Sequence, residues 1–124
     1  MAMIEEDYCS FEIAKLLKEK GFDEHCLTSY NTILSNHKVE ESRVSEWGRA
    51  NQIYRPTQAM TMKWLRKVHK IYVMISPISG KGYGAILCDI GDFDDFNYIG
   101  ETDYFLHPEE AVEAGIKYAL ENLI

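Results

Sequence analysis

The second half of the chain most constrains the fold, because two amphipathic helical segments there enclose a run of β-type segments. Within residues 57–70, apolar and basic side chains fall on opposite sides of a helix. Residues 71–100 contain three β-type runs, and a turn with glycines separates the first two, as in an antiparallel hairpin. An apolar stripe then recurs every three or four residues over residues 108–124. This order predicts an antiparallel sheet packed against helices.

A third amphipathic helix is expected near the start of the sequence, over residues 10–20. Ser10 can cap its first turn by accepting a backbone N–H, and Gly21 fits the left-handed position after its last turn. Residues 26–34 follow with a pattern that is typical of extended structure. Residues 35–55 predict a long loop, with a short strand close to its end.

The whole sequence predicts an α+β protein with a single domain over residues 1–124. We expect a mostly antiparallel sheet of four or five strands with three amphipathic helices, layered as an α/β/α sandwich. A length of 124 residues is usual for one domain, and it allows a core without metal or disulfide staples. Cys9, Cys26 and Cys88 are odd in number and widely spaced, which indicates free thiols in a reducing cytoplasm.

No apolar run in the sequence is long enough to cross a membrane, since the longest one covers only residues 71–75. The first seven residues include three acidic side chains and no long apolar segment, so no secretory signal is expected. The prediction is therefore a cytoplasmic protein that does not bind membranes and needs no cofactor.

Charge is divided unevenly along the chain, whose formal net charge is −7. Six basic residues and no acidic residue lie within residues 49–70, whereas residues 89–124 hold ten acidic residues and one basic residue. Opposed fields of this kind bias which partners can approach each surface. The acidic net charge disfavours tight, sequence-independent binding to nucleic acid, which needs clustered lysine and arginine at the phosphates.

The basic side of the middle helix is the strongest candidate for a binding surface. Three interpretations stay open. It can be a solvated helix face, a docking surface for an acidic protein or for nucleic acid, or a site that the acidic segment of the same chain or of a second copy neutralises. Tryptophan and arginine in the preceding stretch are residue types enriched at protein interfaces. The predicted contact surface comprises Trp47, Arg49, Arg55, Lys63, Arg66, Lys67 and Lys70.

The acidic segment at residues 89–103 is the alternative candidate, as the site of a small metal-dependent hydrolase. Hard cations such as Ca²⁺ bind carboxylate oxygens that a loop holds together. The spacing differs from that of an EF-hand, so a solvated acidic turn is the simpler interpretation and no metal ligand is predicted. The histidines and cysteines match no zinc spacing and no nucleophile signature, so no catalytic residue is predicted. The carboxylates concerned are Asp89, Asp92, Asp94, Asp95, Glu101 and Asp103.

Taken together, the sequence favours a non-enzymatic protein interaction module. Weak nucleic-acid binding through the same helix side is the alternative that uses the same residues, and a steep fall in affinity with salt would be its signature. Self-association through the acidic and basic segments is a further hypothesis.

Three stretches of the sequence carry a resemblance: FEIAKLLKEKGF at residues 11–22, PTQAMTMKWLRKVH at residues 56–69 and EEAVEAGIKYALENLI at residues 109–124. Together they resemble a group of short uncharacterised proteins of gut Bacteroidales and their prophages. The arrangement is also similar to the phage ABA sandwich domain, an α/β/α layered fold. The resemblance implies that fold and a mobile-element context; it implies no activity and no functional residue.

Overall fold

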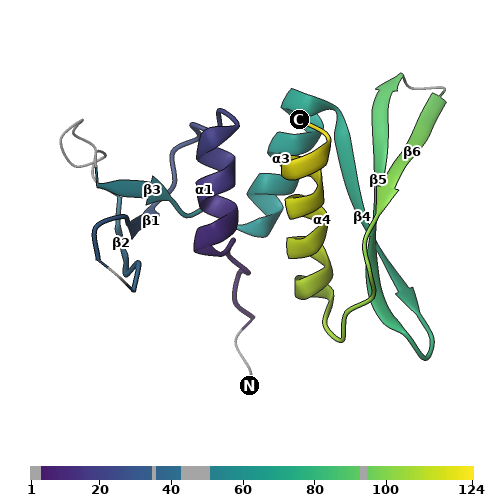
Figure 1. Ribbon diagram of the computed structural model, residues 1–124, viewed down its shortest axis with the longest axis horizontal. Coiled ribbons are helices and arrows are strands. Elements are labelled where there is room, and N and C mark those ends of the chain that lie inside the picture. Colours follow the sequence, from purple (N-terminus) through teal and green to yellow (C-terminus); the bar gives the residue numbers. More distant parts are fainter. Residues whose placement is uncertain (1–3, 35, 43–50, 93–94) are drawn as a thin grey trace. The chain divides into compact units, whose positions relative to one another are not determined.

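The computed structural model describes residues 4–34, 36–42, 51–92 and 95–124. These residues form three helices and six strands, and all strand pairs are antiparallel (Figure 1). In chain order the elements are α1 (Phe11–Glu19), β1 (Thr28–Asn31), β2 (Val39–Glu41), β3 (Gln52–Tyr54), α3 (Gln58–His69), β4 (Ile71–Ile78), β5 (Gly82–Asp92), β6 (Asp95–Glu101) and α4 (Pro108–Asn122).

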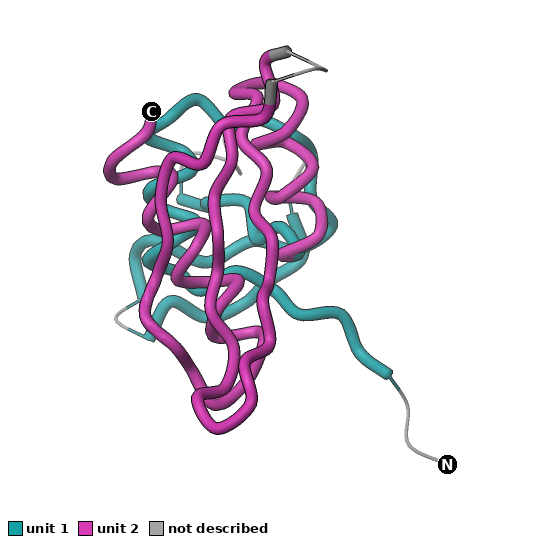
Figure 2. The backbone as a smooth tube through the Cα atoms, turned by 90° about the vertical axis from the view of Figure 1, so that its right-hand side faces the viewer, with its two compact units in different colours: residues 1–57 teal, residues 58–124 magenta. Residues whose placement is uncertain are grey.

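The chain divides into two compact units, which we call unit 1 (residues 1–57) and unit 2 (residues 58–124) (Figure 2). Each unit contains one three-stranded sheet. The predicted α+β class is confirmed. The predicted single sheet of four or five strands is wrong, because β1, β2 and β3 pair in a sheet of their own. β3 confirms the short strand predicted near the end of the loop, whereas β2 was not predicted. That the chain is a single domain stays a prediction.

The helix of unit 1 begins and ends as the sequence predicts. The Ser10 hydroxyl accepts a hydrogen bond from the Ile13 N–H at 3.3 Å, which satisfies a donor of the first turn. Gly21 has a φ of +93°, and the Phe22 N–H donates to the Leu17 carbonyl at 2.9 Å. These features form a Schellman ending, in which glycine adopts the left-handed conformation without steric strain.

The sheet of unit 1 has the order β2-β1-β3, so β1 lies in the middle. Ser29 of β1 pairs with Glu40 on one side and with Tyr54 on the other. α1 lies against β3 and buries one apolar side, while its charged side stays exposed. The buried apolar residues of this unit include Ile13, Ala14, Leu17, Phe22 and Ile53.

The sheet of unit 2 has the order β4-β5-β6, which confirms the predicted meander. Both helices of the unit, α3 and α4, lie on the same face of this sheet (Figure 1). Val73 of β4 and Leu87 of β5 pair with each other and are buried on the helix side. The opposite face has no covering element among the described residues of unit 2, and it faces the viewer in Figure 2.

β4 is therefore buried on one face only. Val73 is 6% exposed, whereas its neighbours Tyr72 and Met74 are 39% and 41% exposed. Consecutive side chains of a strand point to opposite faces, so Tyr72 and Met74 belong to the open face of the sheet.

α4 approaches the sheet closely at Gly115. A Cβ atom at this position would lie 2.8 Å from the Ala85 Cβ and 2.9 Å from the Val73 Cγ1, which is too close for real side chains. The helix begins after His107, whose N–H donates to the Glu110 carboxylate at 3.1 Å. Its predicted apolar stripe is buried, with Ile116, Ala119 and Leu120 fully inaccessible.

Candidate functional site

α3 presents its cations to solvent and its apolar side to the core of unit 2. Lys63 and Lys67 are exposed and Arg66 is half-buried. On the other side, Trp64 and Leu65 are buried. The predicted separation of basic and apolar sides is confirmed at these positions, and it leaves the two lysine side chains accessible to a partner.

Lys70 does not continue this helical row. α3 ends at His69, and Lys70 has a φ of +57°, outside the helical region. Its carbonyl accepts a hydrogen bond from the Ile90 N–H at 2.8 Å, so the residue already belongs to the junction with β4. The predicted helical position of Lys70 is wrong because the chain must reverse here to enter β4 at Ile71. The residue is nevertheless exposed.

Two apolar side chains lie in accessible positions on the same helix. Met60 is 38% exposed and Val68 is 56% exposed, although the helical period places both on the predicted apolar side. Val68 lies about 140° around the helix from Lys63 and so does not belong with the cations. Arg66 lies next to an aromatic side chain, because its guanidinium carbon is 5.6 Å from the centroid of the Tyr72 ring. We call Met60, Lys63, Arg66, Lys67 and Lys70 the α3 surface.

Arg55, another predicted contact residue, lies in unit 1 and is engaged there. Its guanidinium carbon lies 3.8 Å from the Tyr8 ring centroid, and its Nη1 donates to the Thr28 hydroxyl at 3.4 Å. Its Nε is buried and has no hydrogen-bond partner within the described residues. These contacts give Arg55 a structural role in unit 1. The other two predicted contacts of this stretch, Trp47 and Arg49, lie outside the described residues.

The acidic segment contributes little to a metal site in the described parts of the chain. The Asp89 carboxylate accepts a hydrogen bond from the Gly91 N–H at 2.9 Å and thereby closes a local turn. Asp94 and the side chains of Asp92 and Asp95 lie outside the described residues. Among the residues that are described, no group of three or more His, Cys, Asp or Glu is placed to hold a metal ion.

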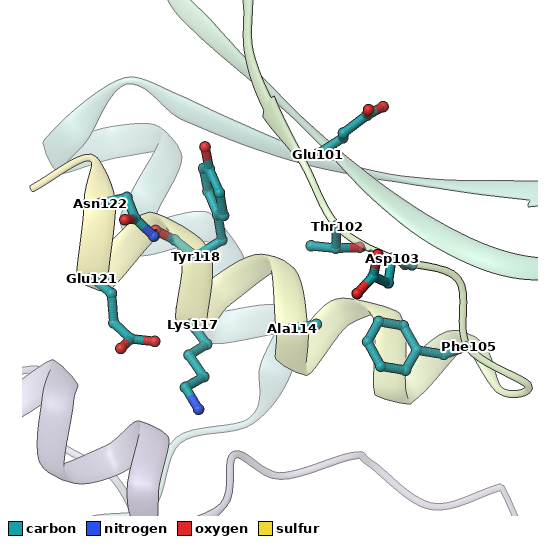
Figure 3. Close-up of a pocket in the computed structure, with 9 residues that line it drawn as sticks. All are labelled: Glu101, Thr102, Asp103, Phe105, Ala114, Lys117, Tyr118, Glu121 and Asn122. Carbon is teal, nitrogen blue, oxygen red and sulfur yellow. Dashed lines mark hydrogen bonds between the residues drawn. The ribbon is translucent and has the colours of Figure 1, made fainter.

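A groove of about 510 Å³ that the sequence does not predict lies between the end of β6, the loop after it and α4 (Figure 3). The Thr102 hydroxyl fixes its loop side by donating to the Asp103 carbonyl at 2.9 Å. Three carboxylates and one lysine give it an acidic character. No local signal predicts it, since segments some 15 residues apart meet only in the folded unit. Its lining residues are Glu101, Thr102, Asp103, Phe105, Ala114, Lys117, Tyr118, Glu121 and Asn122.

The open face of the sheet in unit 2 was also missed. Tyr72 pairs with Cys88, and Cys88 pairs with Tyr98, so the three side chains form a row across the sheet. Tyr98 is 59% exposed. Met74, two residues after Tyr72 and on the same face of β4, is 41% exposed. Apolar residues occupy consecutive positions in β4 and hide the alternation, so the sequence does not reveal that one face of this strand is open.

The cysteines differ in accessibility, and we expect them to differ in reactivity. Burial, and then the charge of Glu24, raises the pKa of Cys26 to about 11. At pH 8 roughly one in a thousand Cys26 thiols is therefore ionised, and the thiolate is the reactive form. Cys88 is half-buried, whereas Cys9 is fully inaccessible. Iodoacetamide at pH 8 should therefore modify Cys88 at least tenfold faster than Cys26.

Peptide mapping of partly alkylated protein measures these rates. In 6 M guanidinium chloride, where burial is lost, the three cysteines should react at similar rates. If Cys26 reacts first in the folded protein, its thiol is activated, and the assignment of Cys26 as a buried thiol of low reactivity is wrong.

No helix in the described ranges is both long and apolar enough to cross a membrane. Comparisons with known protein families, with curated proteins and with solved structures show no match for this chain. A functional assignment therefore depends on the surfaces of the chain itself, of which the α3 surface and the acidic groove are the two most distinct.

Proposed function

We propose that the protein is a small non-enzymatic interaction module that docks an acidic protein partner on the α3 surface. The observation that carries the proposal is the fixed presentation of its cations. Lys63 and Lys67 are exposed on a helix whose other side is anchored in the core by Leu65, which is fully buried. Because the backbone of the helix is pre-organised, binding has to order only the side chains of this surface.

The composition of the α3 surface supports binding to a protein. Met60 is exposed beside the lysines and offers apolar area, which is typical of the centre of an interface. Arg66 lies close to the ring of Tyr72. Arginine and tyrosine are enriched among the interface residues that contribute most to binding.

Electrostatics favours an acidic partner at this surface and orients it. The chain has a net charge of −7, so an acidic partner is repelled by most of the molecule. The α3 surface is a local exception. Complementary charge of this kind contributes to specificity and to the rate of association more than to affinity.

Weak nucleic-acid binding through the same cations is the second candidate. The net charge disfavours it, because most of the surface repels a phosphate backbone. A metal-dependent hydrolase in the Asp89–Asp103 region is a third candidate, and no described group of carboxylates supports it. We also propose an α/β/α layering, a mobile-element origin and a cytoplasmic location, which the sequence and its resemblance imply.

An affinity pull-down with a matched pair of variants tests the proposed function. The first variant reverses the α3 surface with Lys63→Glu, Arg66→Glu, Lys67→Glu and Lys70→Glu. The second reverses four exposed lysines elsewhere, with Lys15→Glu, Lys18→Glu, Lys38→Glu and Lys81→Glu, and so has the same net charge. From a nuclease-treated lysate of a gut Bacteroidales bacterium, we expect a stoichiometric acidic protein with wild type and with the second variant. The first variant should recover at least tenfold less.

Other outcomes assign the surface differently. Recovery that requires intact nucleic acid would support the second candidate and contradict docking of an acidic protein. Equal recovery by both variants would show that the charge of α3 is a solvated feature without a binding role.

A further inference from the structure

Two outer strands, β4 and β6, bound the sheet of unit 2, and β4 is the one that packs against α3. β4 is the first strand in the order β4-β5-β6, and it pairs with β5 along its whole length. On its other side, no strand within the described ranges pairs with it. An edge of this kind presents backbone N–H and carbonyl groups that an additional strand can use.

The hydrogen bonds of β5 show which residues of β4 present these groups. The Tyr83 N–H donates to the Phe105 carbonyl at 2.8 Å, and the Ala85 carbonyl accepts from the Thr102 N–H at 3.0 Å. The backbone groups of Tyr83 and Ala85 therefore point away from β4. In an antiparallel pair, two residues that lie opposite each other either bond to each other or both direct their backbone groups away from the pair. The residues of β4 opposite Tyr83 and Ala85 therefore also direct their N–H and carbonyl groups outward.

The residues opposite are Pro77, which pairs with Tyr83, and Ile75, which pairs with Ala85. Val73 and Ile71, which lie two and four residues before Ile75, direct their backbone groups the same way because the direction alternates along the strand. Pro77 has no N–H and so ends the usable edge. The N–H and carbonyl groups of Ile71, Val73 and Ile75 thus point toward the place of an added segment of about five residues. Ile71 and Val73 are 4% and 6% exposed, so such a segment must displace the side chains that cover this edge.

Positive charge flanks this edge. Arg66 belongs to α3, which lies on the helix side of the sheet, whereas Tyr72 points to the open side. Because the Arg66 guanidinium nevertheless lies 5.6 Å from the Tyr72 ring, its side chain extends past the β4 edge. Lys70 directly precedes the strand and is exposed. A cation at an edge discourages pairing with neutral or basic strands.

We infer that an extended acidic segment of a partner protein binds by adding a fourth strand to the β4 edge. Its backbone pairs with Ile71, Val73 and Ile75, and its carboxylates meet Arg66 and Lys70. Strand addition derives affinity from main-chain hydrogen bonds and selectivity from side chains. The inference depends on the proposed function, because it specifies how the acidic partner is held.

A second copy of this chain fits the edge less well. Pairing β4 with β4 of another copy would bring the two α3 helices close together, since α3 packs against β4 in each. Their cations would then repel one another across the new contact. An acidic partner replaces this repulsion with attraction.

Selective N-methylation of a peptide tests strand addition. The probe is an acetylated, fluorescein-labelled nonapeptide that alternates glutamate and valine, and fluorescence anisotropy measures its affinity. Two analogues carry N-methyl groups either at every valine or at every glutamate, so each loses one row of N–H donors and keeps its charge. We expect one analogue to bind wild type at least tenfold more weakly than the unmodified peptide. The protein variant Ile75→Pro, which removes one outward N–H, should weaken the unmodified peptide similarly while circular dichroism shows a folded protein.

The outcomes separate the inference from the proposed function. If both analogues bind within twofold of the unmodified peptide, strand addition is wrong, although loss of binding in the charge-reversed α3 variant would still support docking. If no peptide binds at millimolar concentration, the inference is wrong, and the pull-down alone decides the proposed function. A mass above the monomer by light scattering without peptide, reduced by Ile75→Pro, would assign the edge to a second copy and overturn the inference.

Discussion

The variant Val73→Asp is expected to prevent unit 2 from folding, whereas Met74→Asp, one residue further, should fold normally. Val73 is 6% exposed and pairs with Leu87, which is completely inaccessible. A carboxylate at position 73 would be a buried charge without a partner, which costs about 3–5 kcal/mol of stability. That loss is comparable with the whole stability of a small domain, roughly 5–15 kcal/mol.

Met74 points to the open face of the same strand and is 41% exposed. A carboxylate at position 74 stays hydrated, and its cost is limited to the poor strand propensity of aspartate, about 1 kcal/mol or less. Circular dichroism and urea denaturation of the two variants measure the difference. If Met74→Asp unfolds as completely as Val73→Asp, the face that carries Tyr72 and Met74 is buried in solution, and the assignment of an open face is wrong.

Local signals in the sequence account for the features that were predicted correctly. The ends of α1 follow from Ser10, which can accept a hydrogen bond from a free N–H, and from Gly21, which tolerates a positive φ. The β4–β5 hairpin follows from two apolar runs with glycines between them. In each case, residues close in sequence determine the structure, so the sequence contains the whole signal.

The features that were missed depend on contacts between distant segments. β2 consists of Val39, Glu40 and Glu41, which have no strand pattern, and it exists through pairing with β1. The Glu40 carboxylate accepts hydrogen bonds from Asn31 at 3.1 Å and from Gln52 at 3.1 Å, so polar contacts with both other strands fix this residue. Propensity cannot predict a strand whose stability comes from its neighbours in the sheet.

Only the part of the candidate site that depends on residues close in sequence was predictable. The helical period places Lys63, Arg66 and Lys67 together without knowledge of the fold. It could not show that Lys70 falls beyond the end of α3, or that the Arg55 guanidinium stacks on Tyr8. Nor could it reveal that β4 is an outer strand, because strand order is a property of the sheet.

Gly115→Leu should destabilise unit 2 by about 3 kcal/mol, despite the better helix propensity of leucine. Glycine costs a helix interior roughly 1 kcal/mol relative to alanine, so propensity alone predicts a gain. The space is missing, however, because even a Cβ atom would lie 2.8 Å from Ala85 and 2.9 Å from Val73. We therefore expect α4 to be displaced from the sheet, with loss of burial at Ile116, which is fully inaccessible.

A double-mutant cycle with Gly115→Ala and Ala85→Gly separates close packing from helix propensity. Gly115→Ala should lower the free energy of unfolding by about 1–2 kcal/mol, and Ala85→Gly by roughly 1 kcal/mol because glycine weakens a strand. In the double variant the added Cβ occupies the space that Ala85 vacated, so the combined loss should be smaller than the sum of the two by about 1 kcal/mol. Urea denaturation of the four proteins gives this coupling energy. Additive effects, or a stabilising Gly115→Ala, would mean that α4 does not lie against β5 at this point, and the shared core of helix and sheet would have to be revised.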